Sequence, residues 1–302
     1  MEELKNIIKN MNLGDTFNEE EVFAQMKQKY LSCPQAVRFV SSLGVSEDAI
    51  NRNIIKINDM VNDIEYCKNC KGIEKCKKEN PLLITKLVNN GGEIERELTP
   101  CKRILEKAML EAQIRIRDFE PEWFTSEIAN LDMSKGRKTA LLKYLAYTKD
   151  EGDEWLYLTG SQNTGRSYFA ATLALDLARK NKGPICFLNS SLRLKELVDL
   201  SYSNKEAFQR RLDLYSRVPV LIIDDFGSEY KTDFVRDGIL LQILVKRSAK
   251  KLFTIFTSDY SIEEIKELYS TSKAGAIQAK RLDKIIRSEA KKEINLGEVS
   301  VY

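Results

Sequence analysis

The segment at residues 160–167 constrains the fold of this chain more than any other feature. Its sequence, Gly-Ser-Gln-Asn-Thr-Gly-Arg-Ser, departs at one position from the phosphate-binding P-loop pattern G-x-x-x-x-G-K-[ST]. A short apolar run at residues 155–158 precedes it, and an apolar stretch with helical character follows at residues 168–178. A P-loop works between a strand and a helix because the helix N-terminus presents backbone N–H groups to phosphate. The segment therefore predicts an α/β nucleotide-binding domain.

The rest of the C-terminal half repeats this alternation. Helical patterns of about 12–18 residues separate short, β-rich apolar runs, which is typical of a parallel sheet with crossover helices. The runs lie at residues 155–158, 185–188, 220–223 and 252–256. We expect a P-loop NTPase domain over residues 135–302, in which helices flank a parallel sheet.

The loop and the first residue after it are the expected nucleotide contacts. They are Gly160, Ser161, Gln162, Asn163, Thr164, Gly165, Arg166, Ser167 and Tyr168. The two glycines permit the backbone turns, and the Ser167 hydroxyl is the expected Mg²⁺ ligand. Arg166 stands where the pattern has lysine. Because its planar fork is longer and wider than an ammonium group, we expect ATP or ADP to bind but hydrolysis to be weak.

Two further strand ends carry acidic residues. The apolar run at residues 220–223 leads into Asp224 and Asp225, about 55 residues after the P-loop. Asp224 is expected to hold Mg²⁺, and Asp225 to polarise the attacking water. The next apolar run ends at Asp259, a position from which a polar side chain can sense the γ-phosphate.

Four of the six cysteines form a cluster at Cys67, Cys70, Cys76 and Cys101. A CxxC turn can place two thiolates on one metal ion, and more distant cysteines can complete a tetrahedral zinc site. Redox chemistry and unligated thiols are the alternatives. The chain contains no histidine, which excludes histidine ligands and Ser-His or Cys-His catalytic pairs. Cys33 and Cys186 are expected to be core residues.

The N-terminal third has a different pattern from the rest. Helical spacing predicts a mostly helical domain over residues 1–104, with the zinc site included, and a connecting helix and linker over residues 105–134, in which the helix ends at Pro121. The formal net charge of +3 leaves only local patches for nucleic-acid contact. No apolar run is long enough to span a membrane, and the first 15 residues lack the apolar core of a signal peptide. We expect a cytoplasmic protein.

Residues 155–259 resemble the AAA+ ATPases of the DnaC/DnaI/IstB group. The resemblance is carried by Phe226-Gly227 after the acidic pair and by the stretches at residues 233–240 and 252–260. The helical start and the cysteine spacing resemble the DnaI-type loaders of the replicative helicase. The resemblance implies that the N-terminal zinc domain binds the hexameric replicative helicase and that the AAA+ domain binds ATP and single-stranded DNA. Other primosome proteins and ATP-dependent self-assembly are further partners that it suggests.

The chain departs from that family pattern in several places. The loaders usually carry a histidine among their zinc ligands, so Cys76 is inferred as the fourth ligand here. Asp259 replaces an asparagine. Arg281 matches the first of two family arginines that act on nucleotide, but Ile285 falls at the second. Lys284 or Arg287 could substitute for it.

The sequence leaves three hypotheses for the function of the whole chain. The first is a helicase loader, the second a non-hydrolysing nucleotide-binding adaptor, and the third an IstB-like transposition ATPase, against which the cysteine cluster argues.

The sequence also allows predictions for several surface residues. Arg236 is expected on a helix surface, with an inter-subunit contact as the alternative. The basic run at residues 246–251 is expected to be a solvated helix end, with a phosphate-binding patch as the alternative. Candidate single-stranded DNA contacts are Tyr230, Lys231, Thr232 and Phe234, where aromatic stacking and a cation occur together.

Overall fold

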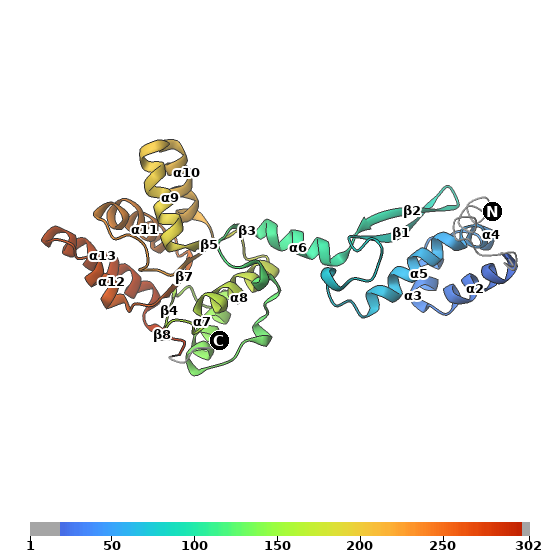
Figure 1. The fold of residues 1–302 in the computed structure, drawn as a ribbon, viewed down its shortest axis with the longest axis horizontal. Helices are drawn as coiled ribbons and strands as arrows, with labels where there is room; N and C mark the ends of the chain where they lie inside the picture. The colour runs from blue at the N-terminus through green and yellow to red at the C-terminus, as the bar shows by residue number, and fades with distance from the viewer. Residues whose placement is uncertain (1–18, 298–302) are drawn as a thin grey trace. The chain divides into compact units, whose positions relative to one another are not determined.

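A computed structural model describes residues 19–297 and divides the chain into two compact units. Unit 1 is Met1–Ala108 and unit 2 is Met109–Tyr302. The division falls within helix α6 (Lys102–Gln113), which runs from one unit into the other (Figure 1). The first 15 residues, which lack the apolar core of a signal peptide, lie outside the described residues. No described helix has the length and apolar character needed to cross a bilayer.

Unit 1 contains the helices that the sequence predicts. They are α2 (Glu19–Leu31), α3 (Pro34–Ser42), α4 (Glu47–Arg52) and α5 (Ile54–Lys68), with a short 3-10 turn, η1, at Ile73–Lys75. Pro34 occupies the first turn of α3, where its missing N–H costs nothing. The Ser46 hydroxyl caps α4 by accepting a hydrogen bond from the Ala49 N–H. Buried side chains of α2, α3 and α5 form the core of the unit.

A β-hairpin completes unit 1, which the prediction of a mostly helical domain missed. Strands β1 (Leu83–Asn90) and β2 (Glu93–Pro100) pair antiparallel through a two-residue turn. Gly91 and Gly92 make that turn at φ of 61° and 93°, a conformation that suits glycine. Leu87 and Ile94 are buried in the same core as α5. Strand β2 has only two apolar residues, Ile94 and Leu98, so its strand pattern in the sequence is weak.

Unit 2 is built on a six-stranded sheet in the order β3-β5-β6-β7-β4-β8, with every pairing parallel. Its strands are β3 (Ile114–Arg117), β4 (Leu156–Thr159), β5 (Ile185–Asn189), β6 (Val220–Asp224), β7 (Phe253–Ser258) and β8 (Glu293–Asn295). The four central strands are those predicted. The prediction of one helix through residue 121 is wrong from Ile114 onward, because β3 alternates buried isoleucines with exposed arginines and pairs with β5.

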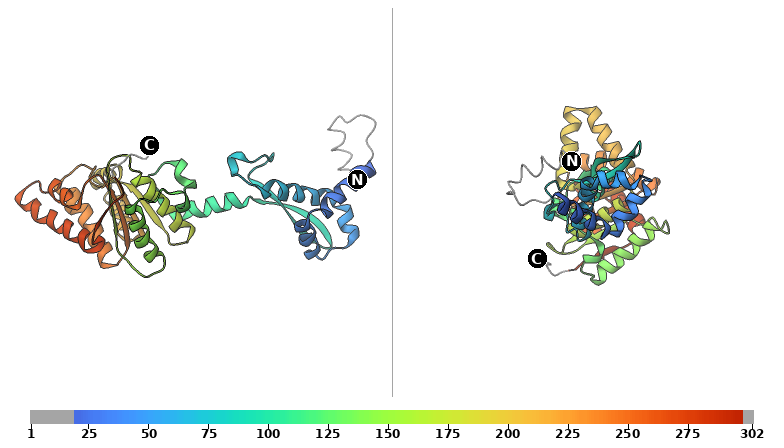
Figure 2. Two further views of the ribbon diagram at one scale, coloured as in Figure 1. Left: turned by 90° about the horizontal axis from the view of Figure 1, so that it is seen from below. Right: turned by 90° about the vertical axis from the view of Figure 1, so that its right-hand side faces the viewer.

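Helices cover both faces of this sheet (Figure 2). Alternate residues of a strand point to opposite faces, and Tyr157 of β4 therefore joins one core cluster while Leu156 and Leu158 join the other. One face packs against α7 (Lys135–Thr148) and α8 (Arg166–Arg179). The other packs against α9 (Ser190–Ser203), α10 (Lys205–Arg217), α11 (Leu241–Ala249), α12 (Ile262–Leu268) and α13 (Lys273–Ala290), together with a π-helix, η4, at Phe234–Leu240. Two 3-10 turns, η2 (Pro121–Thr125) and η3 (Ile128–Asn130), precede α7.

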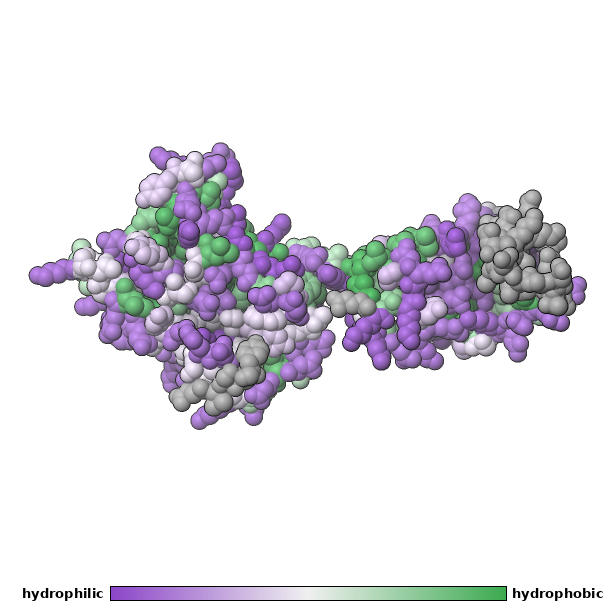
Figure 3. Space-filling view, viewed as in Figure 1, coloured by the Kyte–Doolittle hydropathy of each residue, from purple (hydrophilic) through white to green (hydrophobic). Residues whose placement is uncertain are grey.

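Two arginines expected at the surface lie inside unit 2. Arg247 is fully buried and donates to the Thr254 hydroxyl and to four backbone carbonyl oxygens, so the prediction of a solvated helix end is wrong at this residue. Arg236 is only 2% exposed. Its guanidinium pairs with Asp233 at 2.8 Å and with Asp237 at 2.6 Å. Neither arginine is therefore part of a surface patch. The face drawn in Figure 3 is mostly hydrophilic, with small hydrophobic patches.

Candidate nucleotide-binding site

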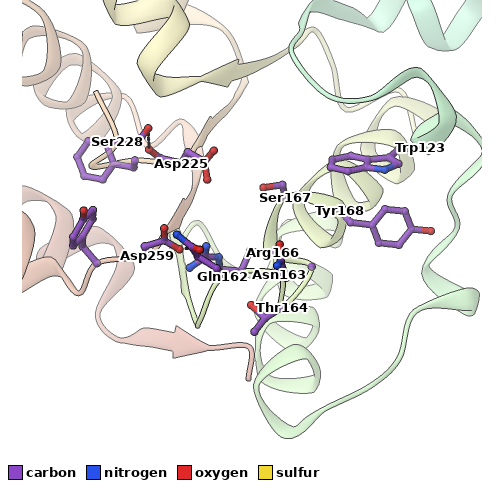
Figure 4. Close-up of a pocket in the computed structure, with 13 residues that line it drawn as sticks. Trp123, Gln162, Asn163, Thr164, Arg166, Ser167, Tyr168, Asp225, Ser228 and Asp259 are labelled. Carbon is purple, nitrogen blue, oxygen red and sulfur yellow. Dashed lines mark hydrogen bonds and ion pairs between the residues drawn. The ribbon is translucent and has the colours of Figure 1, made fainter. Parts of the chain in front are cut away.

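A cavity of about 410 Å³ in unit 2 brings together most of the predicted nucleotide contacts (Figure 4). It lies at the carboxyl ends of β4, β6 and β7, where open α/β sheets bind their ligands. Its lining residues are Trp123, Gln162, Asn163, Thr164, Gly165, Arg166, Ser167, Tyr168, Asp225, Phe226, Ser228, Asp259 and Tyr260. Gly160 and Ser161 belong to the same loop but do not line the cavity.

The loop leaves β4 through backbone conformations that fit glycine. Gly160 has φ of 153°, and a Cβ there would lie 2.8 Å from the Gly297 carbonyl oxygen. Gly165 has φ of 71° and is the N-cap of α8. The Thr164 hydroxyl closes the loop by donating to the Ser161 carbonyl at 2.8 Å. This geometry presents the N-terminus of α8 to the cavity, as a phosphate cradle requires.

Arg137 on α7 supports the loop from behind. Its guanidinium is buried and donates to the Thr164 carbonyl at 2.7 Å and to the Asp132 carbonyl at 2.9 Å. Arg137 is not among the predicted site residues. Its position 27 residues before Thr164 carries no motif, and only the packing of α7 brings it to the loop.

Arg166 is held by protein groups at the edge of the cavity. It is 7% exposed and donates to the Ser258 carbonyl at 2.7 Å and also to the Gly160 carbonyl. Its second terminal nitrogen forms an ion pair with the Asp259 carboxylate. The structure therefore joins two of the positions at which the sequence departs from its relatives.

Asp224 lies at the buried end of β6, just beneath the cavity. Burial, with a smaller contribution from the neighbouring Asp225, raises the pKa of its carboxyl group to about 6, and hydrogen bonds from Thr257 and Ser167 limit the increase. The Thr257 hydroxyl donates to Asp224 Oδ1 at 2.5 Å. Ser167 and Asp224 thus place a hydroxyl and a carboxylate side by side, an oxygen donor pair that fits Mg²⁺.

Asp225 lines the cavity itself. Its backbone is in the left-handed region at φ of 54°, which is uncommon outside glycine and is often found at functional sites. Its N–H donates to the Thr257 hydroxyl at 3.0 Å, which anchors the turn to β7. Burial raises the pKa of Asp225, the Arg166 cation opposes this, and the Asp259 carboxylate adds to it.

The structure does not bring Arg281 to the cavity. It lies on the exposed side of α13 and is absent from the cavity wall. Ile285 packs against the core, and Arg287 pairs with Asp283 at 2.7 Å and with Glu263 at 3.1 Å. In this arrangement none of the three touches the P-loop cavity.

An aromatic wall, of which Tyr168 is a predicted nucleotide contact and Trp123 is not, closes one side of the cavity. Trp123, from the 3-10 turn η2, meets Tyr168 edge to face with ring centroids 5.6 Å apart. Phe226 and Tyr260 lie beside the acidic residues. Trp123 is too far from the loop in sequence for spacing to reveal it.

The four clustered cysteines line one cavity of about 310 Å³ in unit 1. Burial raises the pKa of the Cys67 thiol; the positive charge of Lys78 opposes this, and Cys101 and Cys70 add to the increase. Within residues 19–297, however, no three histidine, cysteine, aspartate or glutamate side chains are gathered closely enough to hold a metal ion. The structure therefore brings the thiols to one place without forming a metal centre.

The sheet, the P-loop and the acidic end of β6 together define a P-loop NTPase with the AAA+ fold. A family model described as IstB-like ATP binding protein matches residues 83–296, more than two thirds of the chain. The chain belongs to this family.

Comparison with individual proteins indicates which members of this family the chain resembles. The chain is 25% identical over 266 residues to the replicative helicase loader DnaI of Bacillus subtilis (strain 168), with 83% of each protein covered. The crystal structure of DnaI matches with a TM-score of 0.54 and 25% identity, over 64% of this chain and 99% of that one. A putative primosome component from Streptococcus pyogenes serotype M3 matches with a TM-score of 0.51 and 25% identity, over 65% of this chain and 98% of that one. The predicted homology to DnaI-type helicase loaders is confirmed.

Proposed function

We propose that this protein loads the replicative helicase during DNA replication. In this role unit 1 binds the helicase hexamer, and unit 2 binds a nucleotide and single-stranded DNA in the cytoplasm. The extent of the similarity to DnaI carries the proposal. The match covers 83% of the chain, so it must extend beyond Met109–Tyr302 into unit 1. An ATPase that shared only its nucleotide domain with the loaders would not match over this length.

The nucleotide site supports ATP or ADP binding with bound Mg²⁺. The loop backbone would hold the phosphates, and Ser167 and Asp224 would hold the metal, which supplies charge neutralisation when bound. Asp225 lies where it could orient a water molecule, and Arg281 could act on the nucleotide only after α13 moves. Because Arg166 is engaged by Asp259, we propose slow hydrolysis at most. The protein would then act mainly through nucleotide-dependent binding of its partners, and ATP hydrolysis would be secondary.

Co-elution with the cognate helicase tests the loader assignment. The full-length protein and the helicase are mixed and separated by size exclusion with light scattering, without nucleotide, with ADP and with ATP. We expect a complex heavier than the helicase hexamer in at least one nucleotide condition. Two separate peaks in every condition would refute the loader function. A complex with a transposase from a neighbouring gene would support the transposition ATPase instead.

We further propose that Cys67, Cys70, Cys76 and Cys101 hold a structural Zn²⁺. Four thiols around one cavity, in a chain without histidine, match the donor set of a tetrahedral zinc site. Metal analysis of reduced protein should give one zinc per chain, and Cys70→Ser should lower that content. Cys33→Ser, which changes a cysteine outside the cavity, is the control and should retain zinc. Less than one zinc per chain in the parent protein would count against the site.

Single-stranded DNA would bind beside the acidic strand end, through Tyr230 and Phe234. Tyr230 is 84% exposed, and Phe234 is 40% exposed and stacks on Phe208 at 6.2 Å between centroids. Lys231 is turned inward, since its ammonium donates to the Gly227 carbonyl. Exposed rings offer π-faces on which bases stack.

An oligonucleotide titration separates this proposal from simple surface exposure. Tyr230→Ala should weaken binding of an oligo(dT) probe by about 5-fold or more, given the usual energy of stacking on one aromatic residue. Tyr202→Ala is the matched control, because Tyr202 is also 84% exposed but lies on α9. Equal losses from the two variants would argue against a localised site at Tyr230.

A further inference from the structure

The cavity carries an unusual balance of charge for a phosphate site. Among the lining residues within the described part of the chain, Arg166 is the one cation, and it faces two carboxylates, Asp225 and Asp259. A P-loop with lysine and a neutral sensor residue would have a net charge one unit more positive at these positions. The charge of Arg166 is already matched by Asp259, with which it forms an ion pair.

Strand pairing places Asp259 beside the start of the P-loop. Strand β4 pairs with β7 in a register that puts Thr159 opposite Ser258. The residues that follow, Gly160 and Asp259, therefore leave the sheet next to each other. Arg166 bridges them by donating to the Gly160 carbonyl, the Ser258 carbonyl and the Asp259 carboxylate. The register of β4 and β7 therefore fixes the pair at the carboxyl ends of these two strands, and the pair does not depend on a mobile surface contact.

The Arg166–Asp259 pair would affect the first two phosphates of a bound nucleotide differently from the third. The first two phosphates lie in the cradle of loop N–H groups, which the ion pair leaves open. A third phosphate would need the Arg166 guanidinium, which must then be shared with or withdrawn from Asp259. The freed carboxylate would remain beside the terminal phosphate oxygens, where like charges repel.

We propose that the Arg166–Asp259 pair makes this site selective for nucleoside diphosphates over triphosphates. The inference rests on the proposed nucleotide site and specifies which nucleotide it retains. Asp259 is then a specificity-determining residue, and ADP is the nucleotide that the protein holds when both are present at equal concentration.

Calorimetric titration of the full-length protein with ADP and with a non-hydrolysable ATP analogue, both with Mg²⁺, tests the selectivity. The wild type should bind ADP about 10-fold more tightly than the analogue. Asp259→Asn keeps the side-chain shape and removes the charge, and it should bring this ratio close to one by strengthening analogue binding. Asp199→Asn removes an exposed charge on α9 and should leave the ratio as in the wild type. Thermal unfolding of each variant confirms that it is folded, and Asp259→Ala provides a second variant.

The outcomes separate this inference from the function on which it rests. A ratio near one in the wild type, or equal changes for both nucleotides in Asp259→Asn, overturns the selectivity while leaving a nucleotide site. Absence of any nucleotide binding overturns both the selectivity and the proposed nucleotide site. Failure of helicase co-elution with the expected nucleotide ratios would remove the loader assignment and leave the selectivity intact.

Discussion

Replacing Asp224 with asparagine should stabilise the nucleotide-free protein. The carboxylate is 5% exposed at the end of β6 and, within the described residues, no cation pairs with it directly. Burial raises its pKa from the ordinary value of 3.8 to about 6, so at neutral pH the folded protein must keep an unfavourable negative charge inside. Asparagine has the same shape and can still accept the hydrogen bond from the Thr257 hydroxyl.

The expected gain follows from the difference between the two pKa values. A carboxyl group with a pKa of about 6 when folded and 3.8 when unfolded costs about 3 kcal/mol of the free energy of unfolding at neutral pH. Between these values the folded state binds more protons than the unfolded state, so wild-type stability falls as the pH rises from about 4 to about 6. Asp224→Asn removes this dependence. In a domain of this size, the gain corresponds to an increase in Tm of about 6–12 °C.

Urea denaturation monitored by tryptophan fluorescence is a suitable assay, because both tryptophans, Trp123 and Trp155, lie in unit 2. Mg²⁺ and nucleotide are left out, since ligands that bind the folded wild type would mask the effect. The advantage of Asp224→Asn should be largest at pH 7.5 and should shrink towards pH 4. Asp199→Asn, at an exposed position, should show no comparable gain. A variant less stable than the wild type at pH 7.5, or a gain independent of pH, would refute the reasoning.

Three other substitutions examine contacts elsewhere in unit 2. Gly160→Ala, whose Cβ would lie 2.8 Å from the Gly297 carbonyl oxygen, should weaken ADP binding by about 10-fold or more in calorimetry, and unchanged affinity would contradict the loop geometry. Arg247→Met leaves four buried carbonyl oxygens without their donor and should lower the free energy of unfolding by about 3 kcal/mol or more, so a loss below about 1 kcal/mol in urea would count against that network. Glu229→Gln should cost about 1–3 kcal/mol, because the buried carboxylate accepts from the Tyr269 hydroxyl at 2.5 Å and from the Gly227 N–H at 2.8 Å; a neutral effect would contradict this.

Much of the fold could be predicted because the sequence patterns that indicate its central strands lie within short contiguous segments. The four central strands are contiguous apolar runs, and all four were found with nearly correct bounds. The edge strands β3 and β8 were missed, since each is only three or four residues long and becomes a strand by pairing with a neighbour distant in sequence. The burial of Arg247 was missed for a related reason. Its charge indicates a surface residue, and only the assembled carbonyl groups around it make burial favourable.

The P-loop itself shows where the information in the sequence ends. The sequence alone determined that a strand, a glycine-containing turn and a helix N-terminus would form a phosphate cradle, because the N–H groups that build it belong to consecutive residues. It also identified Arg166 and Asp259 as two separate departures from the family pattern. Only the tertiary structure decided that these residues, 93 positions apart, form one ion pair. The physical reason is the parallel pairing of β4 with β7, which brings Thr159 level with Ser258 and so places Asp259 beside the loop.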